Sequence, residues 1–95
     1  MVHTKSFNDI KTKYRNAFEA LEVGDLSNGP DRLYAYSFAN FIEALRQYSS
    51  ANLEEEEKEE ILPFGALVAL LMDEFVKRFN LDKQKILRRY GILED

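Results

Sequence analysis

The chain has 95 residues, a net charge of −4, 45% apolar residues and no cysteine. This length and composition predict one domain with a sizeable core. The lack of cysteine excludes a disulfide framework, a thiolate zinc site and a thiol nucleophile, and it favours a reducing compartment. Because residues 1–13 contain no apolar run of the secretory type, we expect a cytoplasmic protein.

Two amphipathic helices are expected in the first half of the chain. Ser6 and Asp9 resemble a capping box that starts the first helix, and Gly24 is expected to end it in a left-handed conformation. Pro30 suits the first position of the second helix. The apolar residues of this helix recur every three or four positions, which predicts a buried stripe of Tyr34, Phe38, Phe41, Leu45 and Tyr48. Whether the helix continues past residues 49–52 stays open.

The middle of the chain is acidic. Asn52 and Glu55 give a second capping signal, and the run of glutamates suits the positive end of a helix dipole. We therefore expect a short, mostly solvated third helix that ends near Glu60.

An apolar segment follows, and residues 61–72 contain no charged or strongly polar side chain. A helix of that length reaches about 18 Å, whereas the hydrocarbon core of a bilayer is about 30 Å thick, so no membrane span is expected. We predict a central helix at about residues 63–79, begun by Pro63 and covered by its neighbours over most of its circumference. Its stripe would contain Phe64, Val68, Leu71, Phe75 and Phe79, widened by Leu67, Leu70, Met72 and Val76.

A last helix is expected after Asn80 or Asp82, with Ile86, Leu87 and Tyr90 facing inward and Gly91 stopping it. No stretch alternates β-branched and polar residues as a strand would. The sequence therefore predicts an all-α fold, a compact four- or five-helix bundle around the central apolar helix. Residues 1–5 would be a flexible N-terminus and residues 6–95 a single helical domain.

No set of residues has the pattern of a catalytic or metal site. His3 is the only histidine, so no serine has an imidazole base and no metal site has a second imidazole. The four glycines stand apart and form no phosphate-binding loop. The acidic run lacks the spaced ligands and the central glycine of a calcium loop. We therefore expect no enzyme, no cofactor and no metal.

Surface charge and one tyrosine supply the candidate binding residues. Residues 51–76 are strongly acidic and residues 77–95 are basic. Tyr36 falls on the polar face of its helix, where it is either an interface anchor or a second contact between helices. The partner-binding candidates are therefore Tyr36, Glu54, Glu55, Glu56, Glu57, Lys85, Arg88 and Arg89.

The lack of reactive residues and the segregated charge favour a small protein-binding module, such as an adaptor, an inhibitor or an immunity-type antagonist. Its partner would be another protein. Two alternatives stay open. The basic last helix could bind nucleic acid or a regulatory complex, although the acidic total disfavours this. Ile92, Leu93 and the tyrosines could instead form a homodimer, as in a structural or self-associating domain.

Residues 18–33 (FEALEVGDLSNGPDRL) and 38–45 (FANFIEAL) resemble small helical bacteriocin-immunity bundles. The resemblance rests on no specific motif, so it implies no site residues.

Overall fold

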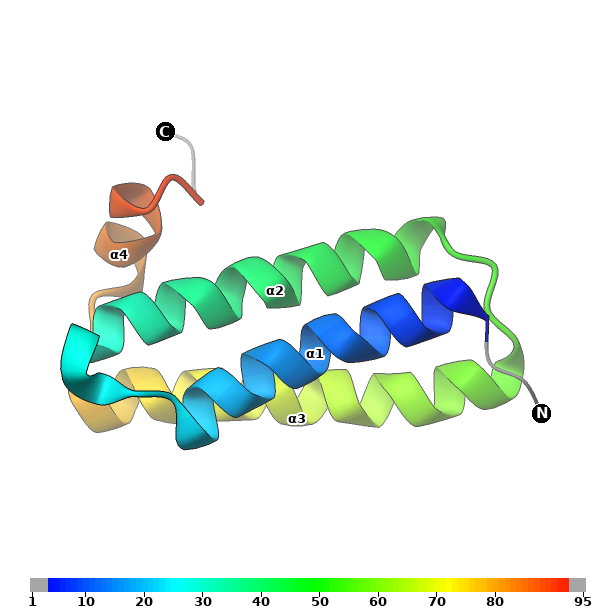
Figure 1. The fold of residues 1–95 in the computed structure, drawn as a ribbon, viewed down its shortest axis with the longest axis horizontal. Coiled ribbons are helices and arrows are strands. Elements are labelled where there is room, and N and C mark those ends of the chain that lie inside the picture. The colour runs from blue at the N-terminus through cyan, green and yellow to red at the C-terminus, as the bar shows by residue number, and fades with distance from the viewer. Residues whose placement is uncertain (1–3, 93–95) are drawn as a thin grey trace.

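The computed structural model describes residues 4–92. Its elements are α1 (Lys5–Val23), the short 3-10 helix η1 (Leu26–Asn28), α2 (Pro30–Ser50), α3 (Glu55–Phe79) and α4 (Lys83–Arg89). Figure 1 shows α1, α2 and α3 side by side along the long axis, with α4 at the end where α2 begins. The predicted all-α bundle is confirmed, with four α-helices and no strand among the described residues.

The first helix starts earlier than its sequence pattern suggests. The Thr4 hydroxyl oxygen accepts a hydrogen bond from the backbone N of Phe7 (3.1 Å), so Thr4, and not Ser6, caps α1. Of the expected flexible segment, Thr4 and Lys5 therefore belong to the folded part, and residues 1–3, with His3, lie outside the described residues.

Gly24 ends α1, but the expected left-handed conformation is wrong. Its φ and ψ angles are −65° and 150°, which any residue can adopt. The glycine is required for space, because a Cβ there would lie 2.3 Å from the carbonyl oxygen of Ala20 and 2.7 Å from the side chain of Leu33. The chain can therefore make a tight turn between α1 and α2 at this point.

The two helices expected between residues 52 and 79 are one helix, α3, with Pro63 inside it. α2 does not continue into it, because residues 51–54 are not helical. Pro63 has no N–H to donate to the carbonyl of Glu59, but both residues are exposed, so water can bond that carbonyl. Burial of apolar residues on both sides of the proline outweighs its cost of roughly 3 kcal/mol.

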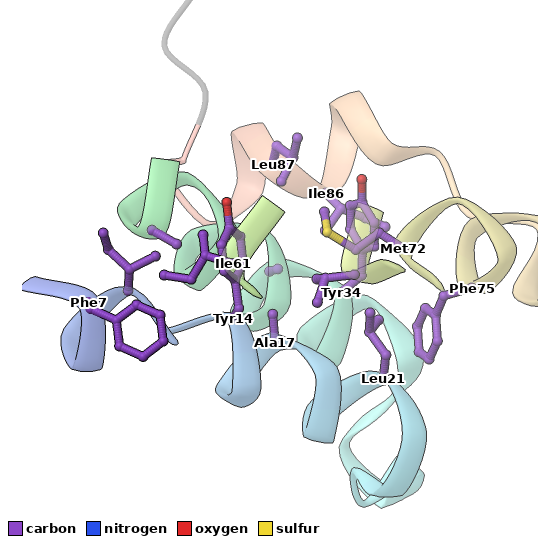
Figure 2. Close-up of a cluster of buried hydrophobic side chains, with 14 of the residues drawn as sticks. Phe7, Tyr14, Ala17, Leu21, Tyr34, Ile61, Met72, Phe75, Ile86 and Leu87 are labelled. Carbon is purple, nitrogen blue, oxygen red and sulfur yellow. The ribbon is translucent and has the colours of Figure 1, made fainter. Parts of the chain in front are cut away.

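The core lies between α1, α2 and α3, and Figure 2 shows its side chains pointing toward one another from these helices and from α4. Gly65 brings α1 close to α3, because a Cβ at that position would lie 2.9 Å from the ring of Tyr14. The Tyr14 ring also packs against Phe41 and Phe64, with centroid separations of 5.7 and 6.1 Å. α3 contributes buried residues at spacings of four and three, which are Ile61, Gly65, Val68, Met72 and Phe75.

α1 and α2 make the most extensive contact between any two of the helices. Small residues allow this approach: Ala17 of α1 and Ala44 of α2 are fully buried. The buried Ser37 hydroxyl donates a hydrogen bond to the carbonyl oxygen of Ala17 (3.2 Å), which adds a polar contact inside the pair.

The apolar middle part of α3 differs from the expectation that neighbouring helices cover most of its circumference. Leu62, Leu67 and Leu70 are 54%, 43% and 64% exposed. The buried stripe of α3 faces α1 and α2, and nothing among residues 4–92 covers the opposite side. We call this side the outer face of α3, and it consists of the exposed residues Leu62, Pro63, Ala66, Leu67, Ala69 and Leu70.

The end of α3 and both ends of α4 follow the capping signals in the sequence. Asn80 ends α3 in the left-handed conformation, with φ of 53°. The Asp82 carboxylate accepts a hydrogen bond from the backbone N of Lys85 (3.2 Å), so Asp82 is the cap of α4. Gly91 has φ of 73°, and the backbone N of Ile92 bonds the carbonyl of Leu87 (2.8 Å), which closes the helix as expected.

Candidate protein-binding surfaces

The outer face of α3 is an apolar surface on the side of the bundle away from the core. Leu62, Ala66 and Leu70 recur every four residues and therefore lie on one line along the helix. Pro63, Ala66, Leu67 and Leu70 have the i, i+3, i+4, i+7 spacing of four residues that surround one side chain of a partner helix. The outer face can therefore receive a helix by knobs-into-holes packing.

Acidic residues border the outer face at both ends. Glu55, Glu56 and Glu59 precede it, and Asp73 and Glu74 follow it, all of them exposed. Two lysines partly offset this charge. The Nζ atom of Lys58 lies 3.7 Å from a carboxylate oxygen of Glu55, and that of Lys77 lies 3.9 Å from one of Asp73. Among residues 4–92, no ion pair involves Glu56, Glu59 or Glu74.

The glutamates predicted as one acidic contact surface do not all reach the surface. Glu54, Glu55 and Glu56 are exposed, but Glu57 is only 1% exposed, so its prediction as a partner-binding residue is wrong. One carboxylate oxygen of Glu57 accepts a hydrogen bond from the backbone N of Glu54 (3.0 Å), and the other accepts from the backbone N (2.9 Å) and the hydroxyl (3.2 Å) of Thr4. Glu57 thus joins the positive ends of α1 and α3, where a buried negative charge is favoured.

Tyr36 lies at the surface and not in a second contact between helices, since it is 51% exposed. It borders a shallow depression of about 410 Å³ between the first half of α2 and residues 90–92. Tyr90, which was expected to face inward, is 44% exposed and also lines this depression. The lining residues are Arg32, Ala35, Tyr36, Ala39, Tyr90 and Ile92.

The basic residues of α4 stand near this depression. Lys85, Arg88 and Arg89 are exposed, and one guanidinium nitrogen of Arg89 lies 3.5 Å from a carboxylate oxygen of Asp31 on α2. The structure therefore brings Tyr36 and the predicted basic residues to one end of the bundle. The start of α3, with Glu54, Glu55 and Glu56, is at the other end (Figure 1), so the predicted residues form two separate surfaces.

The groups with shifted pKa values lie away from all of these surfaces. Burial raises the pKa of the Tyr14 and Tyr34 phenols, with smaller contributions from Tyr48 and Asp73, respectively. A hydrogen bond from the backbone N of Ser27 lowers the pKa of Asp25 in the turn between α1 and α2. These shifts follow from core packing and turn geometry, and none of them prepares a group for proton transfer at a binding surface.

The leucines of the outer face were missed because the whole apolar segment was assigned to the core. Two signals in the sequence could have found them. Apolar residues occupy every side of the helix between residues 61 and 72, which is wider than the stripe that a small bundle covers. Ala66, Leu67 and Leu70 also lie on the side of the helix away from the Ile61, Gly65 and Val68 stripe when the helix is drawn at 3.6 residues per turn.

Within residues 4–92, no three acidic, histidine or cysteine side chains are grouped so that they could hold a metal ion. No helix in this part of the chain is both long and apolar enough to cross a membrane.

Comparison of the chain with protein-family models, with characterised proteins and with solved structures finds no match. The comparisons therefore give no support to the resemblance of residues 18–45 to bacteriocin-immunity bundles. A function has to be inferred from the surfaces of the protein.

Proposed function

We propose that this chain is a small, non-enzymatic protein-binding module and that the outer face of α3 is its contact surface. One observation supports the proposal above all others, the exposure of Leu62, Leu67 and Leu70 on one side of a single helix, with Ala66 between them. Single exposed leucines are common in soluble proteins, but a contiguous apolar patch marks a contact site far more often. The cytoplasmic location expected from the composition is part of this proposal.

Burial of this face would supply part of the free energy of binding. Together, the exposed fractions of the three leucines equal about one and a half fully exposed leucine side chains. Burying one leucine contributes roughly 1.5–3 kcal/mol, so covering all three would contribute about 2–5 kcal/mol to an interface. Because the face lies on a continuous helix, little conformational entropy is lost when a partner docks there.

The test is capture of partners on the immobilised chain, comparing wild type with the double variant Leu67→Ser/Leu70→Ser. The matched control is Leu45→Ser, which changes a leucine of α2 that is 41% exposed and lies outside the outer face. We expect the same protein to be retained by wild type and by the control, and to be lost from the double variant. Retention by the double variant, with its melting temperature unchanged, would refute the proposal.

Nucleic-acid binding by α4 has weaker support. The helix has only seven residues, and Arg89 is already paired with Asp31 at 3.5 Å. The depression beside Tyr36 could hold a side chain of a second partner, but its volume of about 410 Å³ is open to solvent and contains no enclosed pocket. We therefore place the primary contact on α3.

A further inference from the structure

The charges around the outer face of α3 indicate which kind of partner fits it. The face is apolar from Leu62 to Leu70, which spans about 12 Å at 1.5 Å per residue. Glu59 lies one turn before Leu62 and Asp73 one turn after Leu70, on the same side of the helix. A docking helix would therefore meet an apolar centre with a carboxylate at each end, although the Nζ atom of Lys77 lies 3.9 Å from a carboxylate oxygen of Asp73.

The holes into which side chains of a partner helix would pack are likewise apolar at the centre of the face and include a carboxylate at each end. The central hole is formed by Pro63, Ala66, Leu67 and Leu70 and is wholly apolar. The hole before it includes Glu59, and the hole after it includes Asp73, at the same i, i+3, i+4, i+7 spacing. The small side chain of Ala66 belongs to all three holes and leaves room for a large apolar knob.

A second copy of this chain would bring both like and opposite charges together at this face. If two α3 helices pair antiparallel about Ala66, Glu59 of each helix lies opposite Asp73 of the other, and Lys77 of each lies opposite Glu55 of the other. If they pair in parallel, Glu59 lies opposite Glu59. Like charges at the border of an interface oppose association and favour other partners, and Glu59 has no neutralising ion pair among the described residues.

We propose that the outer face of α3 binds an amphipathic helix of another protein, with apolar residues at its centre and Lys or Arg at both ends. This inference rests on the proposed function and names the partner class for the same surface. The apolar knobs supply the affinity, and the basic ends supply the selectivity. They pair with Glu59 before the face and with Glu74 after it, because neither carboxylate has an ion pair among the described residues, whereas Asp73 is paired with Lys77.

The inference is tested with synthetic helical peptides as probes, each about three heptads long with leucine at the a and d positions. One peptide carries two lysines at each end, a second carries two glutamates at each end, and a third has lysine ends but serine in place of leucine. Binding to the purified full chain is measured by fluorescence anisotropy at about 20 mM salt, where charge effects are strongest. We expect the peptide with leucines and lysine ends to bind at least about tenfold more tightly than the other two.

Variants of the chain separate the two contributions. Leu67→Ser/Leu70→Ser should weaken binding of the lysine-ended peptide by about tenfold or more, whereas Leu45→Ser should not. Glu59→Gln/Glu74→Gln should weaken it about three- to tenfold at low salt, and this effect should vanish near 1 M salt. Asp9→Asn/Glu19→Gln, at two exposed positions of α1, makes the same change in net charge and should change the affinity less than twofold.

The partner class is refuted if the lysine-ended and glutamate-ended peptides bind equally, or if the Glu59/Glu74 variant binds as wild type does. It is also refuted if sedimentation shows a wild-type dimer that Leu67→Ser/Leu70→Ser converts to monomer. The proposed function fails in a different way. It is refuted if a captured cellular partner stays bound when the leucines are replaced. A cellular partner that needs the leucines but not the charges would overturn this inference and leave the proposed function standing.

Discussion

Replacement of Glu57 by glutamine tests the contact through which this buried carboxylate joins the beginnings of α1 and α3. The carboxylate accepts hydrogen bonds from the backbone N of Glu54 and from the backbone N and the hydroxyl of Thr4. Glutamine keeps the shape of the side chain but has only one oxygen that can accept. Its amide nitrogen is a donor, so it would face the backbone N–H of either Glu54 or Thr4 with no acceptor between them.

The expected loss of stability can be estimated from these contacts. A hydrogen bond to a charged acceptor contributes roughly 1.5–3 kcal/mol, and a buried N–H left without an acceptor costs roughly 1–3 kcal/mol. The favourable interaction of the charge with two helix dipoles is lost as well, at about 0.3–1 kcal/mol each. Because these contributions overlap, we expect Glu57→Gln to lower the free energy of unfolding by about 2–4 kcal/mol.

The measurement is urea unfolding followed by far-UV circular dichroism, with Glu56→Gln as the control. Glu56 is the adjacent residue, it is exposed, and its replacement makes the same change in net charge. Surface replacements of this kind stay within about 0.5 kcal/mol of wild type. If the two variants lose the same free energy within about 0.5 kcal/mol, the hydrogen bonds of Glu57 do not stabilise the bundle and the reasoning is refuted.

Three further changes test the packing and the ionisation of the core. Gly24→Ala would place a Cβ 2.3 Å from the carbonyl oxygen of Ala20, so we expect a loss of about 1–3 kcal/mol in urea unfolding, and an unchanged midpoint would contradict the clash. Pro63→Ala restores a backbone donor at an exposed position inside α3 and should raise the free energy of unfolding by about 1–3 kcal/mol, whereas a loss would show that the proline ring is needed. Because burial raises the pKa of Tyr14 and Tyr34 above the value of 10.0 for an exposed phenol, the unfolded chain releases these protons first, and stability should fall as pH rises above 10. The double variant Tyr14→Phe/Tyr34→Phe should show a smaller fall between pH 9 and 11, and parallel curves for both proteins would contradict this expectation.

The helices themselves could be predicted from the sequence because their apolar residues recur with the helical period over many turns. The all-α bundle, the turn at residues 24–29 and the stop at Gly91 follow from such local signals. Local signals were misleading at Pro63, which reads as a helix start. Packing of α3 against α1 and α2 before and after the proline overrides that preference, and packing is not visible in a local pattern.

The candidate site was less predictable, because exposure depends on which helices lie beside each face. Glu57 is of a residue type that usually lies at the surface, yet it is buried and accepts a hydrogen bond from Thr4, which is far away in sequence. Leu67 and Leu70 are of a residue type that usually lies in the core, yet no helix among residues 4–92 covers them. Tyr36 was correctly assigned to the polar face of α2, because its position follows from helical periodicity alone.

The close pairing of α1 and α2 has a consequence for how the chain folds. The two helices are consecutive, and only residues 24–29 join them, so bringing them together closes a short loop at small entropic cost. Contacts between sequence neighbours of this kind tend to form early, and we expect the α1–α2 hairpin to be present in the folding transition state. Weakening the Ala17–Ser37 contact should then slow refolding, while weakening the buried stripe of α3 should mainly speed unfolding, since α3 docks last onto a hairpin that is already assembled.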